Sequence, residues 1–419
     1  MATQARPGAE TLLSDRYERV RALSRAIAAP LSDADATIQP SPEASPAKWH
    51  LAHSTWFFET FVLRDHVPSH RLYDEGFAYL FNSYYEGEGG RHPRERRGML
   101  SRPSLDEVLA WRAYVDEALV RSLRFLPAEA LQLVELGLNH EQQHQELMLT
   151  DILAAFAENP LAPALWERAP EPAAPPAPQM SGTAVPGGVA DIGHDGNGFA
   201  FDSERPRHRV LIQPFEIADR AVTNAEWLRF IEAGGYETPG HWTADGWGWV
   251  RANTIEAPLY WRRGDGGWMR FGLDGLHPVD PAEPVCHVSW YEADAFARWG
   301  GARLPTEAEW EVAAWGLDPA SGNQLDEAGP VRPRAPAHGS RQMFGDVWEW
   351  TASPFTPYPG FRPQEGTVGE YNGKFMANQF VLRGGSCATP RGHVRASYRN
   401  FFYPHQRWQF CGLRLARDL

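Results

Sequence analysis

Apolar residues recur every three or four positions through four stretches in the first part of the chain: residues 12–29, 49–63, 105–125 and 128–156. This spacing predicts helices with one apolar face, and four helices of such length predict a bundle. Ser104 and Glu107 form a capping box before the third helix, and Pro127 is typical of the start of the fourth.

The pattern changes after residue 158. Residues 159–188 contain the run APEPAAPPAPQ, whose prolines favour extended structure, so a semi-rigid linker is expected there. Beyond it, short segments such as HRVLIQPFEIA alternate with Gly, Pro and Trp, and only residues 224–233 and 290–299 are typical of helices. We therefore predict an α+β multidomain chain, with a helical domain at residues 9–158 and a mixed domain at residues 189–419.

Length and composition agree with this division. A chain of 419 residues exceeds what one hydrophobic core usually serves, and 17 Trp, 38 Gly and 35 Pro indicate much irregular structure. The formal charge of −13 disfavours nucleic-acid binding. No apolar run is long enough to cross a bilayer and no stretch is of signal-peptide type, so no membrane partner and a cytoplasmic location are expected.

The cysteines, Cys286, Cys387 and Cys411, are few, odd in number and far apart in the sequence. This argues against a disulfide framework or a thiolate metal site. Any metal is then expected to be held by histidines or carboxylates.

A histidine pair gives the clearest chemical signal. His140 and His144 are four residues apart on a predicted helix, so both project from one face and can chelate one ion. A polar helix face is the competing interpretation. His66 and His70 share the spacing, but Pro68 between them disfavours the helix that would align them.

Hydrolysis is not predicted: unlike in the zinc-protease motif, a glutamate, Glu146, follows the second histidine by two positions, and Glu141 is not expected to occupy the general-base position. A third ligand is needed, and His53 lies on another predicted helix among large apolar residues, where a metal or a hydrogen bond would satisfy a buried imidazole. A hydrogen-bonded core histidine is the alternative. Three imidazoles suit Fe(II) and O₂ chemistry, although the same set would bind Zn(II).

The segment FNSYYEGEGGRHPRERRGMLSRP carries further reactive groups. The adjacent Tyr84 and Tyr85 can donate a proton, and the guanidinium groups of Arg94 and Arg97 can hold a carboxylate. A loop of stacked aromatic side chains and solvated arginines is the competing interpretation.

These residues resemble a known family. WHLAHSTWFFETFVL, the NSYYEGEGGRHPRERRGMLSRP segment and the HxxxHxE pattern are similar to the DinB-like helical domain of ergothioneine-biosynthesis sulfoxide synthases. The motifs VTNAEW, VSWYEADAFARWGGARLPTEAEWE, FGDVWEWT, LRGGSCAT and GLRLARD resemble the formylglycine-generating, or sulfatase-modifying-factor, fold, which is C-type-lectin-like. The fusion of the two is far more specific than either domain alone.

The resemblance implies a role for each matching residue. It implies Fe(II) on His53, His140 and His144, with Tyr84 and Tyr85 beside the metal as in the type II branch. It also implies that Arg94 and Arg97 hold the carboxylate of the sulfur substrate, and that the histidine-derived substrate is contacted by Gln143, Asn400, Phe401 and Phe402.

The implied reaction joins cysteine to trimethylhistidine (hercynine) with O₂, giving hercynylcysteine sulfoxide. γ-Glutamylcysteine is an alternative thiol donor, and an ovothiol-type synthase acting on histidine and a selenoneine synthase are related alternatives. A zinc-dependent DinB-like thiol transferase or hydrolase and a noncatalytic lectin-like binding module are alternatives of other classes. Formylglycine generation is not expected, because Cys387 lacks the close second cysteine that copper binding needs.

Overall fold

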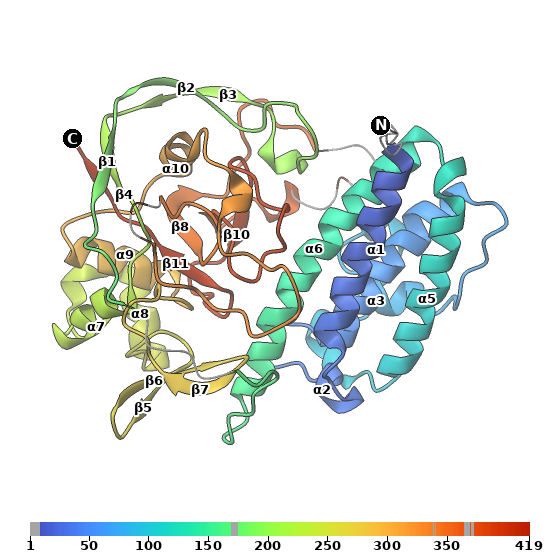
Figure 1. Cartoon of the computed structure of the whole chain (residues 1–419), viewed down its shortest axis with the longest axis horizontal. Coiled ribbons are helices and arrows are strands. Elements are labelled where there is room, and N and C mark those ends of the chain that lie inside the picture. Colours follow the sequence, from blue (N-terminus) through green and yellow to red (C-terminus); the bar gives the residue numbers. More distant parts are fainter. Residues whose placement is uncertain (1–8, 169–174, 338, 340, 364–368, 370–372) are drawn as a thin grey trace, which may run out of the picture. The chain divides into compact units, whose positions relative to one another are not determined.

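The computed structural model describes residues 9–168, 175–337, 339, 341–363, 369 and 373–419 (Figure 1). The chain divides into two compact units, the first made of residues up to 158 with residues 327–329, and the second made of the rest. Residues 169–174 of the expected linker lie outside the described residues, and strand β1 (Gly182–Val185) falls within the range expected to be linker.

The first unit is helical, as predicted (Figure 1). Its helices are α1 (Ala9–Ala28), α2 (Asp33–Thr37), α3 (Ala47–Phe58), α4 (Phe77–Phe81), α5 (Leu105–Ser122) and α6 (Ala128–Ala157). A π-helical turn, η1 (Glu59–Arg64), continues α3, and 3₁₀ turns form η2 (Glu86–Glu88), η3 (Arg94–Met99) and η4 (Leu123–Phe125). The four long helices lie close to the predicted ranges because their apolar spacing is a local property of the sequence.

The start signals of two helices are confirmed. The Ser104 hydroxyl accepts a hydrogen bond from the Glu107 amide, and the Glu107 carboxylate accepts one from the Ser104 amide at 2.7 Å, so the capping box before α5 is complete. Pro127 precedes the first residue of α6.

Helix α3 differs from the prediction, because it has no solvent-facing side. All of its residues from Ala47 to Phe58 are buried, and it packs against α1, α5 and α6. A helix at the centre of a bundle is covered all round, so polar residues such as His50 and His53 are buried with the apolar ones. Each of these polar groups therefore needs a partner inside the unit.

The second unit mixes short strands and helices. Its strands after β1 are β2 (Gly188–Ile192), β3 (His208–Ile212), β4 (Phe215–Ala218), β5 (Trp261–Gly264), β6 (Gly267–Gly272), β7 (Gly275–Pro278), β8 (Trp348–Pro354), β9 (Phe380–Arg383), β10 (Asn400–Phe402), β11 (Cys411–Leu413) and β12 (Ala416–Asp418). They form sheets of order β1-β4-β12, β10-β9-β8-β11, β2-β3 and β5-β6-β7. Strand β11 pairs with β8 in parallel, and the other pairs are antiparallel.

Helices of this unit include two that the sequence analysis missed. They are α7 (Asn224–Glu232), α8 (Ala244–Asn253), α9 (Trp290–Trp299) and α10 (Glu307–Ala314), with 3₁₀ turns η5 (Asp202–Glu204), η6 (Pro239–His241), η7 (Pro319–Ser321) and η9 (Gly373–Phe375). Helices α7 and α9 were predicted, whereas α8 and α10 were not. A local signal for α10 does exist, because Thr306 and Glu309 form a capping box at its start.

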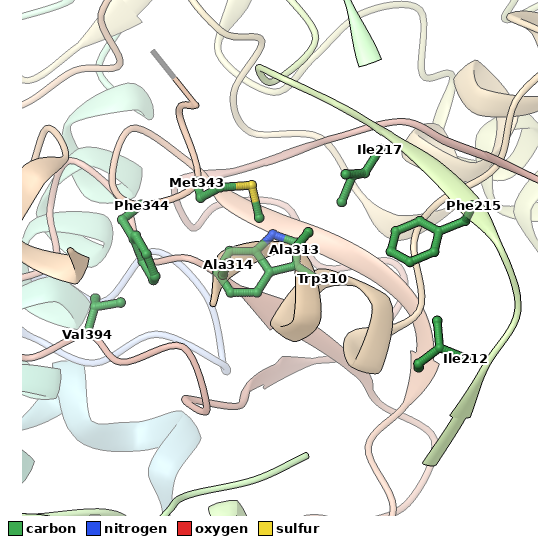
Figure 2. Close-up of a cluster of buried hydrophobic side chains, with 9 residues drawn as sticks. All are labelled: Ile212, Phe215, Ile217, Trp310, Ala313, Ala314, Met343, Phe344 and Val394. Atoms are coloured by element: carbon green, nitrogen blue, oxygen red, sulfur yellow. The ribbon is translucent and has the colours of Figure 1, made fainter. Parts of the chain in front are cut away.

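Trp310, on α10, lies at the centre of an apolar cluster of this unit (Figure 2). The other members of the cluster are Ile212, Phe215, Ile217, Ala313, Ala314, Met343, Phe344 and Val394. The indole NH of Trp310 donates to Glu349 at 2.6 Å, and Arg414 pairs with the same carboxylate at 2.6 Å. The buried charges are thus paired and hydrogen-bonded, as burial requires.

Together the two units form an α+β multidomain fold, as predicted.

Helices long and apolar enough to span a bilayer are absent from the described part of the chain.

Candidate metal centre

Helices α3 and α6 bring the predicted ligand histidines together. His53 on α3 and His140 and His144 on α6 each offer a ring nitrogen, and these nitrogens lie within 4.8 Å of one another. The Nε2 atoms of His140 and His144 are 3.1 Å apart. Since zinc–nitrogen bonds are about 2.0–2.1 Å long, such a spacing fits two ligands of one ion. His70, of the competing pair, instead bonds Glu59 at 3.1 Å.

The surroundings of His53 fix the orientation of its ring. Its Nδ1–H donates to the carbonyl of Phe81 at 2.6 Å, which leaves Nε2 with the lone pair that a metal needs. The ring stacks on Trp49 at 4.7 Å and on Trp56 at 5.5 Å, with interplanar angles of 12° and 13°. His53 is therefore held in one tautomer and one plane.

Burial keeps these histidines neutral. Loss of solvent lowers the pKa of His140 to about 4, although the neighbouring Glu141 carboxylate opposes the shift. Burial, followed by the charge of His140, also holds the pKa of His53 and of His144 well below the usual range. Neutral imidazole is the form that binds metals, so the residues fit a metal ion of the iron, zinc, copper or nickel group.

Glu141 requires a correction to the sequence analysis. It directly follows His140, which is the place of the general base in HExxH zinc proteases, so the sequence alone does not exclude hydrolysis. The fold removes Glu141 from that role, because its buried carboxylate pairs with Arg21 at 2.8 Å and with Arg112 at 2.7 Å. Burial by itself raises the pKa of the Glu141 carboxyl. The charges of the two arginines outweigh burial and bring this pKa down to about 2. A carboxylate so paired is a poor proton acceptor.

Arg97 lies beside the histidines and is buried. Its Nη1 donates to the Ser45 hydroxyl at 3.0 Å and its Nη2 to the Ser83 hydroxyl at 3.3 Å, and its guanidinium lies 3.4 Å from the ring centre of Trp49. Burial lowers its pKa to about 9. The Trp49 ring also stacks on His53 at 4.7 Å and lies 6.1 Å from the His144 ring, so one indole separates Arg97 from both histidines.

Arg94 is one 3₁₀ turn before Arg97 on η3 and is exposed. Its Nη1 donates to the Tyr84 hydroxyl at 2.7 Å, and its Nη2 donates to the carbonyl of Glu43. The structure thus places both predicted arginines on η3, Arg94 exposed and Arg97 buried.

The two tyrosines point to different surroundings. Tyr84 is half-buried and engaged by Arg94, whereas Tyr85 is buried with its ring 5.4 Å from Trp56 and 5.2 Å from Phe61. Trp56 is the indole that stacks on His53. Tyr85 is thus separated from a candidate ligand by one ring.

The remaining predicted site residues are spread over both units. Gln143 is half-buried on α6, next to His144. Asn400, Phe401 and Phe402 form β10 of the second unit, where Phe401 stacks on Phe355 at 4.1 Å. Contacts of these residues with the histidine-derived substrate remain a prediction.

Sequence reasoning missed His50 and Asp151. His50 Nδ1 is 2.8 Å from Nδ1 of His144, and His50 Nε2 is 3.0 Å from a carboxylate oxygen of Asp151. Helical spacing could have found them, because His50 is one turn before His53 and Asp151 is two turns after His144. The cysteines Cys286, Cys387 and Cys411 are buried in the second unit and are not joined by disulfides.

Both parts of the chain match family models. Residues 16–148 match the DinB superfamily, and residues 168–332 and 319–419 match the sulfatase-modifying factor enzyme 1-like domain. The second part is also similar to the formylglycine-generating enzyme of Streptomyces coelicolor, at 32% identity over 64% of this chain and 97% of that protein.

Relatives that contain both parts are similar over nearly the whole chain. The hercynine oxygenase of Mycolicibacterium smegmatis is 35% identical over 92% of this chain and 94% of its own length. The hercynine oxygenase of Mycobacterium tuberculosis is 36% identical over the same shares. The chain therefore belongs to the hercynine oxygenase family, in which a DinB-type helical domain is fused to a sulfatase-modifying-factor-type domain.

Proposed function

We propose that this protein is an Fe(II)- and O₂-dependent oxidoreductase of ergothioneine biosynthesis that joins cysteine to hercynine. A thiol, an imidazole C–H and O₂ give one sulfoxide and one water. The new C–S bond replaces the S–H and C–H bonds, one oxygen atom goes to sulfur, and the other leaves as water with both hydrogens. O₂ is thereby the four-electron oxidant, and no further reductant is needed.

The observation that carries this proposal is the buried group His53, His140 and His144 in a chain that aligns with hercynine oxygenases over 92% of its length. Neutral imidazoles with no carboxylate in the group suit a metal that must keep positions open for substrates. The buried ion pairs of Glu141 also argue against the hydrolytic alternative.

We assign the ligand role to His53, His140 and His144. When bound, ferrous iron supplies the redox chemistry that makes O₂ reactive toward a thiol and an imidazole carbon. The protein supplies the neutral ligands, the fixed ring of His53 and a water-poor setting.

Substrate orientation is assigned to the arginines. Arg97, buried without a carboxylate partner among the described residues, would bind the carboxylate of cysteine, with Arg94 nearby as a second donor. This contact would hold the sulfur end of the substrate toward the histidines. Gln143 on α6, and Asn400, Phe401 and Phe402 on β10, would contact hercynine.

The phenols are assigned proton delivery. Tyr84 or Tyr85 would give a proton to the oxygen atom that leaves as water, because a phenol is a donor that stays protonated at neutral pH. Tyr85 has the more protected setting, since it is buried against Trp56.

The proposal is tested with the full chain loaded anaerobically with Fe(II). Oxygen uptake and product mass should be measured with hercynine plus cysteine, and in parallel arms with γ-glutamylcysteine, with histidine in place of hercynine, and with a selenosugar donor. We expect the fastest O₂ uptake and a coupled sulfoxide with hercynine plus cysteine. A faster reaction in another arm would reassign the substrate while keeping the reaction class.

The Zn(II)-loaded chain is the control, because Zn(II) has no redox chemistry but fits the same ligands. It should bind substrates without consuming O₂. An Fe(II)-loaded chain that takes up no O₂ with any substrate pair would overturn the proposal. Hydrolysis or thiol transfer by the Zn(II)-loaded chain would favour the DinB-like alternative.

A further inference from the structure

A series of buried hydrogen bonds connects the candidate ligand His144 to Arg97. His144 Nδ1 lies 2.8 Å from His50 Nδ1, and His50 Nε2 lies 3.0 Å from Oδ2 of Asp151. The same Oδ2 accepts the backbone N–H of Ser45 at 2.7 Å, and the Ser45 hydroxyl accepts Arg97 Nη1 at 3.0 Å. All five residues are buried. None of the three linking residues, His50, Asp151 and Ser45, has a role in the proposed reaction.

The direction of these bonds follows from what each atom can donate. The Asp151 carboxylate accepts, so Nε2 of His50 carries the proton. A metal takes the lone pair of one ring nitrogen of a histidine and leaves the proton on the other. Nδ1 of His144 faces His50, so it is the nitrogen that donates, and Nδ1 of His50 accepts. His144 therefore carries its proton on Nδ1 when it holds a metal. Its Nε2, which faces His140 Nε2 at 3.1 Å, is left with the lone pair.

We propose that His50 and Asp151 are positioning residues that fix the tautomer and ring orientation of His144 for metal binding. The inference rests on the proposed metal site and adds a relay of two residues to it. His53 is oriented by a backbone carbonyl, whereas His144 is oriented by a carboxylate acting through a second imidazole. Partners of this kind typically change metal affinity by about 10–100-fold when they are removed.

Asp151 has a second effect, because it is shared with the arginine. Its charge raises the pKa of Arg97 against the stronger effect of burial, and Ser45 bonds both side chains. Removing the Asp151 charge should therefore disturb both the orientation of His144 and the setting of Arg97. Removing His50 should disturb the orientation of His144 alone.

The test measures Co(II) binding to the full chain by competition with a chelator. His50→Phe keeps a ring of similar size and removes both nitrogens, and we expect Co(II) affinity to fall by about 10–100-fold. His70→Phe is the matched control, because His70 is also a side chain paired with a buried carboxylate, Glu59 at 3.1 Å, in the same unit. It should keep the parent Co(II) affinity even if it lowers thermal stability.

Two further readouts separate positioning from general damage. At saturating Co(II), the visible absorption bands of His50→Phe should differ from those of the parent, whereas those of His70→Phe should match. Asp151→Asn keeps the side-chain size and removes the charge, so it gives an answer even if His50→Phe does not fold. Asp151→Asn should weaken Co(II) binding and also raise the KM for cysteine. His50→Phe, measured at saturating metal, should keep the KM for cysteine near the parent value.

Parent-like Co(II) affinity in a folded His50→Phe chain, or in Asp151→Asn if His50→Phe does not fold, would overturn the relay. A parent chain that binds no Co(II) would overturn the metal site and the relay together. If the parent binds Co(II) tightly, the relay variants weaken it and the Fe(II)-loaded parent consumes no O₂, then the relay stands and the proposed reaction alone is wrong.

Discussion

At the scale of single residues, Arg97 is the strongest sign of an anionic substrate. It is a buried cation held by two serine hydroxyls and the face of Trp49, with no carboxylate at ion-pair distance among the described residues. A buried charge without a charged partner is costly, and burial lowers the pKa of Arg97 to about 9. A substrate carboxylate would supply the missing partner, which neither the exposed Arg91 nor the exposed Arg96 requires.

Replacing Arg97 with Lys should raise the KM for cysteine by about 10–100-fold. Lys keeps the charge but loses the planar fork, and one hydrogen bond to a charged group contributes roughly 1.5–3 kcal/mol. Steady-state kinetics at saturating hercynine measure the change. Arg91→Lys is the control, because Arg91 is exposed and pairs with Glu86. Unchanged KM values in both Arg97→Lys and Arg94→Ala would remove the arginines from the site.

The tyrosines should decide the fate of O₂ rather than substrate binding. In Tyr84→Phe and Tyr85→Phe the ring remains and the donor is lost, so both substrates should still bind. With proton delivery impaired, product should shift from coupled sulfoxide toward cysteine sulfinate, as read by mass spectrometry. We expect the larger shift for Tyr85→Phe, since Tyr85 is buried against Trp56 while Tyr84 is bonded to Arg94. Coupled sulfoxide alone, at the parent rate, from both variants would make the pair structural.

At the scale of elements, the site depends on the contact between α3 and α6. One long helix, α6, carries His140, His144 and Asp151 at spacings of one and two turns, so all three project toward α3. The helices come close at Gly137, one turn before His140, where a Cβ atom would lie 2.5 Å from the ring of Phe58. The absence of a side chain at this position lets α6 approach α3.

Gly137→Ala should therefore destabilise the protein, although alanine favours helices. The added methyl group would press on two buried rings, Phe57 and Phe58, and overpacking of this kind costs about 1–3 kcal/mol. Urea unfolding measures the loss, and Co(II) affinity should fall with it because the helices that carry the ligands must separate.

Gly248→Ala is the matched control for this variant. Gly248 lies on α8, and nothing lies within 4 Å of a Cβ atom placed there. Alanine at that position should raise the unfolding free energy by roughly 0.5–1 kcal/mol. Equal effects of the two substitutions would mean that the contact at Gly137 can relax.

At the scale of the whole molecule, both units bury charged networks and neutral histidines. In the first unit Glu141 pairs with Arg21 and Arg112, and in the second Glu349 pairs with Arg414. Alongside these, burial lowers the pKa of His287 in the second unit to about 3, although backbone hydrogen bonds with Gln409 and Trp408 oppose the shift. Groups of this kind make the stability of the whole chain depend on pH.

The stability due to His287 should be lost as pH falls from about 6.5 toward 3. The unfolded chain binds a proton at this residue near pH 6.5, whereas the folded chain stays neutral until about pH 3, so acid favours unfolding. Between pH 7 and 5 the loss should reach about 2 kcal/mol, at 1.36 kcal/mol for each unit below 6.5.

His287→Asn should flatten this part of the pH dependence of urea unfolding. Asparagine tolerates the left-handed backbone at this position, where φ is 61°. His405→Asn, at an exposed histidine, is the control and should leave the slope near that of the parent. If the unfolding free energy of His287→Asn changed with pH as steeply as that of the parent, His287 would not be neutral in the folded chain.

The sequence by itself determined the long helices of the first unit and the histidine pair on α6, and the family resemblance added His53. Helix periodicity, the capping box at Ser104 and the spacing of His140 and His144 are encoded within a few residues of one another, so they could be predicted without the fold. The family motifs predicted the two-part architecture, which the family matches confirm.

Only the tertiary structure decided which residues become partners. His50 and Asp151 are 101 positions apart; helical spacing places each on the side of its helix that carries a ligand histidine, but only the packing of α3 against α6 brings them within hydrogen-bond distance. The same holds for the parallel pairing of β11 with β8 and for the ion pairs that occupy Glu141. Periodicity reports which face of a helix is apolar, but it does not show that α3 is enclosed on every side. That enclosure buries His50 and His53 of α3 and gives each a hydrogen-bond partner, because packing decides which groups leave solvent and which groups meet.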